Sequence, residues 1–165
     1  MFKLAIIQDS SFMDKGQLMI LPATKDERIW AARLLSATEP WITLGIGFEK
    51  SLRTCSDEEL LLYVAHYDAT PCGVIIIDPR GVAGSPYIKS IAVQESFRNM
   101  GIGAALIDFA ENFFKSTSRY IFLCVSSFNT KARSLYKKLG YVETGELKDY
   151  IIDGASELLM SKRLS

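Results

Sequence analysis

Residues 94–106 read QESFRNMGIGAAL, and this stretch decides the fold. It follows an extended apolar run, Tyr87–Val93, and precedes a segment with helical periodicity that starts at Ile102. A strand, a glycine-containing turn and a helix in this order aim backbone N–H groups at a bound anion, because the first helical turn leaves those groups without intrahelical partners. The sequence therefore predicts an anion site where this helix begins.

The turn also contains the residue types that a phosphate site needs. Gly101 and Gly103 lack a Cβ, so a phosphate group could approach the main chain closely. Arg98 adds a permanent cation whose fork of donors suits phosphate oxygens. A Rossmann turn would need a third glycine where Leu106 stands, and the sequence has no Gly-Lys-Ser/Thr run typical of a P-loop. A plain tight turn is the alternative interpretation.

The spacing Arg-x-x-Gly-x-Gly, after Ile91–Val93 and before the segment Asn129–Tyr136, resembles the GCN5-related N-acetyltransferase family. The resemblance covers residues 60–164 well and the N-terminal third more loosely. In that family the turn holds the pyrophosphate of acetyl-coenzyme A (acetyl-CoA). The resemblance implies a single N-acetyltransferase domain over residues 1–165 with acetyl-CoA as its cosubstrate.

Hydrophobic periodicity along the chain predicts one α/β (α+β) domain, in which a mixed, mostly antiparallel sheet of six to seven strands has helices on both faces. A capping box, Thr24–Glu27, opens the first helix, and Asn129 is a good N-cap for the last. A turn is expected at Asp78–Gly81. The predicted strands are Gln17–Leu21, Leu60–Tyr67, Cys72–Ile77, Tyr87–Val93, Tyr120–Val125, Tyr141–Glu143 and Ser156–Arg163.

The composition is typical of an ordinary soluble globular protein with no net charge. Nineteen basic and nineteen acidic residues cancel, so no field of the whole chain attracts nucleic acid or anionic lipid. The apolar runs are too short to span a membrane, and the apolar start at residues 1–7 is too short for a secretory signal, so we expect a cytoplasmic protein. Three scattered cysteines and one histidine, His66, argue against a disulfide framework and a metal site.

The resemblance also implies which residues bind the carrier. The strand residues Ile91, Ala92 and Val93 would pair with the amides of the pantetheine arm, and the N–H of Val93 would stabilise the charge that develops on the thioester oxygen. Asn129 and Tyr136 would contact the carrier as well. The residues of the pyrophosphate turn are Arg98, Asn99, Met100, Gly101, Ile102, Gly103 and Ala104.

Tyr136 is the candidate proton donor to the leaving thiolate. In the family a tyrosine seven residues after a strand-end asparagine takes this role, and the distance from Asn129 to Tyr136 matches. Both residues also have plain structural interpretations, because Asn129 suits an N-cap and Tyr136 belongs to an apolar helical stripe.

The sequence does not identify the general base. Some protein N-terminal acetyltransferases of the family have a glutamate twelve residues before the tyrosine, where this chain has Cys124. Freeing a lysine amine of pKa about 10.4 at neutral pH costs roughly 4–5 kcal/mol, whereas an α-amine of pKa about 7.7–8.0 costs only about 1 kcal/mol. Glu49, Tyr87 and Glu146 are weak candidates for a base or a substrate contact.

We therefore expect an N-acetyltransferase that passes the acetyl group of acetyl-CoA to a primary amine, of a small molecule or a protein, by direct attack in a ternary complex. The main alternative is a non-catalytic acyl-CoA-binding sensor domain of the same fold, and a nucleotide-binding α/β module is the next. No metal, nucleic acid or membrane is expected as a partner. A homodimer is compatible with the sequence, which does not identify the amine acceptor.

Overall fold

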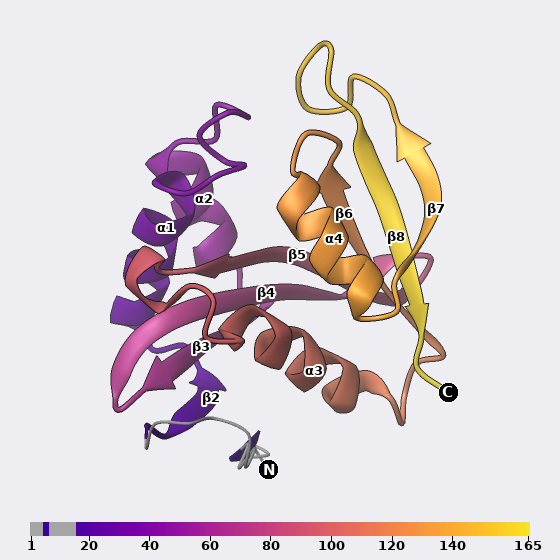
Figure 1. Cartoon of the computed structure of the whole chain (residues 1–165). Helices are drawn as coiled ribbons and strands as arrows, with labels where there is room; N and C mark the ends of the chain where they lie inside the picture. Colours follow the sequence, from indigo (N-terminus) through magenta and orange to yellow (C-terminus); the bar gives the residue numbers. More distant parts are fainter. Residues whose placement is uncertain (1–4, 7–15) are drawn as a thin grey trace.

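The computed structural model describes residues 5–6 and 16–165 (Figure 1). Most of the apolar start of the chain, on which the prediction about secretion was based, lies outside the described residues. Among the described helices, none is long and apolar enough to cross a membrane.

Strands and helices follow one another largely as predicted. The strands are β1 (Ala5–Ile6), β2 (Leu18–Pro22), β3 (Leu61–Tyr67), β4 (Thr70–Val82), β5 (Ser85–Val93), β6 (Tyr120–Ser126), β7 (Val142–Leu147) and β8 (Glu157–Arg163). The helices are α1 (Lys25–Ser36), α2 (Phe48–Ser56), α3 (Ile102–Phe114) and α4 (Thr130–Lys138), with a 3₁₀ turn, η1, at Glu95–Phe97.

Within the described residues the strands form a single mixed sheet in the order β1-β2-β3-β4-β5-β6-β8-β7. Neighbouring strands are antiparallel except β5 and β6, which are connected through α3 and pair in parallel. Seven strands of five residues or more agree with the predicted number, and the two-residue β1 extends one edge. The predicted mixed, mostly antiparallel sheet is therefore confirmed.

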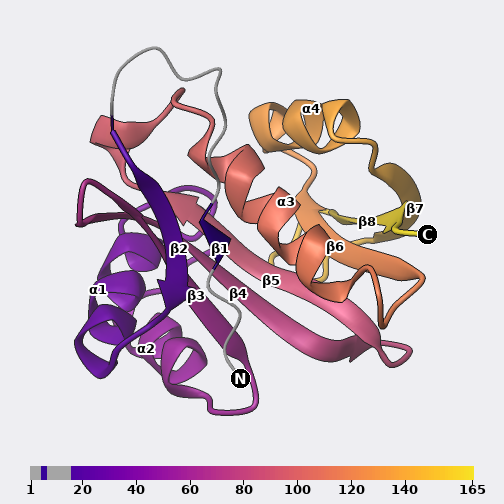
Figure 2. The ribbon, with the colours of Figure 1, turned by 90° about the horizontal axis from the view of Figure 1, so that it is seen from below.

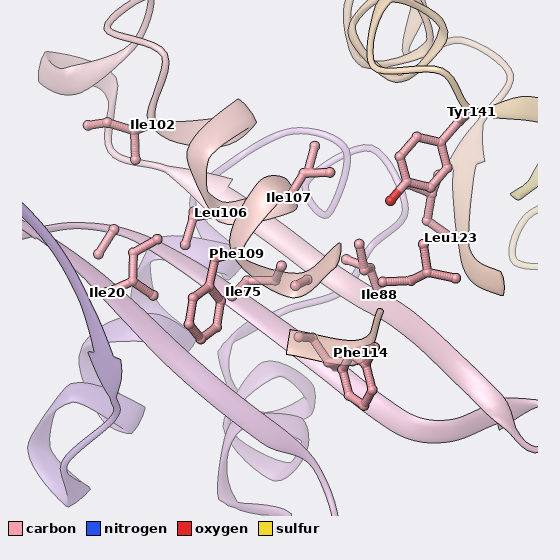
Figure 3. Close-up of a cluster of buried hydrophobic side chains, with 14 of the residues drawn as sticks. Ile20, Ile75, Ile88, Ile102, Leu106, Ile107, Phe109, Phe114, Leu123 and Tyr141 are labelled. Atoms are coloured by element: carbon pink, nitrogen blue, oxygen red, sulfur yellow. The ribbon is translucent and has the colours of Figure 1, made fainter. Parts of the chain in front are cut away.

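The central strand β4 explains why both faces of the sheet need helices. Its side chains alternate between two clusters of buried residues: Val74 and Ile76 pack on the side of α1 and α2, and Ile75 and Ile77 pack on the side of α3. Figure 3 shows the second cluster, in which Leu106 and Phe109 of α3 lie over the sheet. Figure 2 shows α4 beside β6, β8 and β7, away from α1 and α2.

The turn expected at Asp78–Gly81 is wrong, because β4 continues to Val82. The residues of this segment are of types that favour turns. In the structure the Asp78 side chain accepts a hydrogen bond from the Arg80 N–H (2.9 Å), as in a turn, but the segment is an irregular part of the strand. The chain reverses at Ala83 and Gly84, which both have positive φ (49° and 79°), as in a tight hairpin.

The N-terminus of α1 is closed by the predicted capping box. Thr24 accepts a hydrogen bond from the Glu27 N–H (3.3 Å), and the Glu27 carboxylate accepts one from the Thr24 N–H (2.8 Å). The other oxygen of Glu27 contacts the ring of His66 on β3. This contact joins α1 to the sheet and gives His66 a structural role.

We expect Thr24→Ala to lower the free energy of unfolding by about 1 kcal/mol, because an alanine leaves the Glu27 N–H without its cap. Thr24→Ser keeps the hydroxyl and should stay close to the wild type. Urea unfolding at constant m-value measures both. Equal stability of the two variants would mean that the hydroxyl contributes nothing.

Candidate active site

A cavity of about 610 Å³ opens on the side of the sheet from which the α1–α2 and β7–β8 connections rise (Figure 1). One wall comes from these two connections, including Trp41 and Tyr150. The floor comes from β5 and β6, and α4 closes one side with Tyr136. Backbone, apolar and acidic groups therefore surround one space large enough for part of a substrate.

This cavity exists because β5 and β6 separate. They pair only at Tyr87 with Phe122 and at Ile88 with Leu123, and β6 then turns away from β5 (Figure 1). In the ladder between β4 and β5, Ile76 faces Ser90 and Ile77 faces Ile88, so Lys89 is an extra residue, a β-bulge. A bulge bends its strand and increases its twist, which is consistent with the early separation.

The separation leaves backbone groups of β5 without a partner strand. Gln94 donates its N–H to the Cys72 carbonyl (2.8 Å). Hydrogen-bonded and non-bonded pairs alternate in an antiparallel ladder, so the peptide groups of Ile91 and Val93 point to the opposite edge, toward the gap beside β6. The N–H and carbonyl of Ile91 and the N–H of Val93 are available to an extended ligand.

The turn after β5 carries the backbone geometry of an open helix N-terminus. Asn99 and Gly101 have positive φ (64° and 78°), and α3 begins at the next residue, Ile102. No side chain of the described residues caps α3. A Cβ added at Gly103 would meet its nearest atoms at 3.9 Å, so the helix start is open on this side. Arg98 donates from Nε to the Val93 carbonyl (3.4 Å), which keeps the guanidinium beside the end of β5.

Asn129 and Tyr136 have the structural roles that the sequence allowed for them. Asn129 is the N-cap of α4, accepting from the Ala132 N–H (3.2 Å), and Tyr136 packs against the core. Both also line the cavity. Burial raises the pKa of the Tyr136 hydroxyl to about 12, so this group stays protonated at neutral pH and can act as a donor.

The structure brings some of the predicted site residues into the cavity and places others at its margin. Ile91, Asn129 and Tyr136 line it. Ala92 points its side chain into the cluster under α1 and α2. Val93 and the turn residues from Arg98 to Ala104 lie outside the cavity lining, at the end of β5 and the start of α3, where a ligand in the gap would continue.

Among the candidate bases from the sequence, the structure favours none of the glutamates. Glu49 on α2 and Glu146 on β7 are exposed and do not line the cavity, whereas Tyr87 does. Burial, first of all, raises the pKa of Tyr87, and the nearby Cys124 and Glu157 raise it further. Tyr87 is therefore protonated at neutral pH, a poor state for a base.

Sequence reasoning missed Glu157, the first residue of β8. Its side chain lines the cavity although the residue is only 6% exposed, and it accepts a hydrogen bond from Ser126 of β6. The available signal was a carboxylate directly before the apolar residues Leu158–Met160, within the predicted strand Ser156–Arg163.

The thiol of Cys124 lies in the same group of side chains. Burial raises its pKa, so it remains a neutral thiol at pH 7. Cys55 and Cys72 are buried elsewhere, and burial raises the pKa of each to about 11. The cysteines are thus small buried or half-buried groups without nucleophilic character.

Comparison with known proteins finds similar sequences among acetyltransferases. The model of the acetyltransferase (GNAT) family matches residues 26–141. An uncharacterized N-acetyltransferase of Methanocaldococcus jannaschii is 35% identical over 123 residues, which are 73% of this chain and 74% of that protein. An N-alpha-acetyltransferase of Sulfurisphaera tokodaii is 38% identical over 80 residues, about half of each chain (47% and 48%).

A solved structure has the same fold. An aminoglycoside 6'-N-acetyltransferase complexed with coenzyme A superimposes with a TM-score of 0.73 at 17% identity, over 88% of this chain and 97% of that one. At this identity the likeness concerns the fold.

Proposed function

We propose that this chain, which belongs to the acetyltransferase (GNAT) family and is an N-acetyltransferase, transfers the acetyl group of acetyl-CoA to a primary amine. The amine attacks directly, in a ternary complex. The observation that carries the proposal is the gap between β5 and β6, which runs from the uncapped start of α3 to the cavity. The coenzyme A complex of the similarly folded aminoglycoside acetyltransferase supports this choice of carrier.

In the proposed complex the pyrophosphate lies on the turn from Arg98 to Ala104. The free N–H groups of the first turn of α3 and the positive end of its dipole favour an anion there. Each hydrogen bond to a charged acceptor contributes about 1.5–3 kcal/mol. The pantetheine arm would then extend along the peptide group of Ile91 and the N–H of Val93 and place the thioester beside the cavity.

Two groups at this end act on the reacting atoms in the proposal. The Val93 N–H, which points into the gap, would donate to the carbonyl oxygen as it becomes negative. The amine nitrogen bonds to the carbonyl carbon, the C–S bond breaks, and the Tyr136 hydroxyl donates to the departing sulfur. The amine nitrogen then loses a proton, which returns the Tyr136 hydroxyl to its protonated state.

The acceptor is a primary amine that enters the cavity from the α1–α2 and β7–β8 connections. Peptides with a free α-amine are one class to test, because the Sulfurisphaera tokodaii relative is an N-alpha-acetyltransferase. Their amine also costs the least to deprotonate at pH 7, about 1 kcal/mol. Small-molecule amines are the other class, as in the aminoglycoside acetyltransferase with the same fold.

We expect Gly103→Glu to weaken acetyl-CoA binding by about tenfold or more, because a carboxylate at the helix start repels the pyrophosphate. The space around Gly103 accommodates a side chain, so the fold should persist. Isothermal titration measures the affinity, and Ser116→Glu, which adds the same charge at an exposed site beyond the other end of α3, is the control. Equal affinity of both variants would rule out the turn as the anchor.

We expect Tyr136→Phe to lower kcat by about 10²–10⁴-fold and to change acetyl-CoA affinity little, because the ring still packs while the proton donor is gone. Tyr120→Phe, outside the cavity lining, should keep its rate. Steady-state assays with an identified acceptor measure both. An unchanged kcat would assign Tyr136 to packing alone, and a wild type that binds acetyl-CoA without acetylating any amine would favour the sensor alternative.

A further inference from the structure

Glu157 is the one acidic residue with a buried side chain in the part of the chain that the structure describes. No Lys, Arg or His of this part lies within ion-pair distance of its carboxylate. Burying a carboxylate without a counter-ion costs free energy, and a hydrogen bond from Ser126 offsets only part of this cost. A purely structural role would be served better by an apolar residue, which points to a functional role.

The position of Glu157 in the sheet directs its side chain to the reaction side. Glu157 lies opposite Ser126, and Leu159 lies opposite Cys124 on β6. Because side chains alternate along strands, these four share one face of the sheet, and all four line the cavity. Tyr136, the proposed donor to the thiolate, lines the same cavity from α4.

We propose that Glu157 is the catalytic base, which accepts a proton from the ammonium group of the acceptor before attack. This step rests on the acetyl transfer proposed above. The ammonium gives one proton to the Glu157 carboxylate, and the neutral amine attacks the thioester carbonyl. The second proton leaves the nitrogen as the C–S bond breaks and reaches the sulfur through Tyr136. Glu157 returns its proton to solvent, so the products are the amide, the free thiol and one proton.

The surroundings of Glu157 suit a base for an amine. Burial raises the pKa of its carboxyl group, and the hydrogen bond from Ser126 lowers it in part. A raised pKa makes the carboxylate a stronger proton acceptor. The groups near its carboxylate are Tyr87 of β5 and Cys124 of β6, and burial raises the pKa of each. Tyr150 of the β7–β8 connection also lines the cavity. The other charged residues of the cavity lining are Glu39, Asp78, Lys50 and Lys89.

The decisive variant is Glu157→Gln, which keeps the shape and an acceptor for Ser126 but cannot take a proton. We expect kcat/KM at pH 7 to fall by about 10²–10⁴-fold while acetyl-CoA affinity is unchanged. In the wild type, kcat/KM should fall only at a pH below the pKa of the amine, because Glu157 can deprotonate the ammonium group. In the variant only the neutral amine reacts, so the fall should occur at the pKa of the amine. Asp153→Asn, an exposed carboxylate four residues earlier that does not line the cavity, is the control and should keep the wild-type profile.

A second variant tests the same idea if Glu157→Gln does not fold. Ser126→Ala removes the hydrogen bond that lowers the pKa of Glu157, so the pKa rises further. The acid limb should then move to higher pH with the base still present. A profile identical to the wild type in either folded variant would overturn the assignment of Glu157. Failure of the proposed function has a different signature, because the wild type would then acetylate no amine.

Discussion

The separation of β5 and β6 after two residue pairs is the constraint on which the site depends. Parallel strands joined by a helix normally continue to pair, and here the bulge at Lys89 bends β5 before they can. The cost is a set of backbone groups without a strand partner at Ile91 and Val93. A ligand with amide groups of its own can satisfy them, and in the proposed complex the carrier arm takes this place.

The rest of the fold holds this gap open. The clusters on the two faces of β4 make the middle of the sheet rigid, so β5 is supported along its whole length on the β4 side. On the other side, β6 pairs with β8 over seven residues and moves away together with it and α4. One buried cluster that includes α3 joins β4 and β5 to β6 and β8, while the parallel contact between β5 and β6 is short, and the cavity lies where this contact ends.

Local patterns in the sequence were sufficient for the parts that depend on local physics. The capping box of α1, the glycine turn before α3 and the N-cap Asn129 need only neighbouring residues, and all are present. The length of β4 was wrong because pairing with β5 overrides the turn propensity of Asp78–Gly81. Glu157 was missed because its burial follows from contacts with β6, thirty-one residues earlier, which no local pattern records.

Cys124 and Glu157 lie on neighbouring strands, so a carboxylate that is missing from one strand can be supplied by the next. Some protein N-terminal acetyltransferases of the family have a glutamate at the position of Cys124. Cys124 and Glu157 are diagonal neighbours on one face of the β6–β8 ladder, and such neighbours have Cα atoms about 7–8 Å apart. A glutamate side chain is long enough to span most of that distance, so a carboxylate at position 157 on β8 can reach nearly the same part of the cavity as one at position 124 on β6. A base can thus be absent from its expected position along the chain and still be present in the cavity.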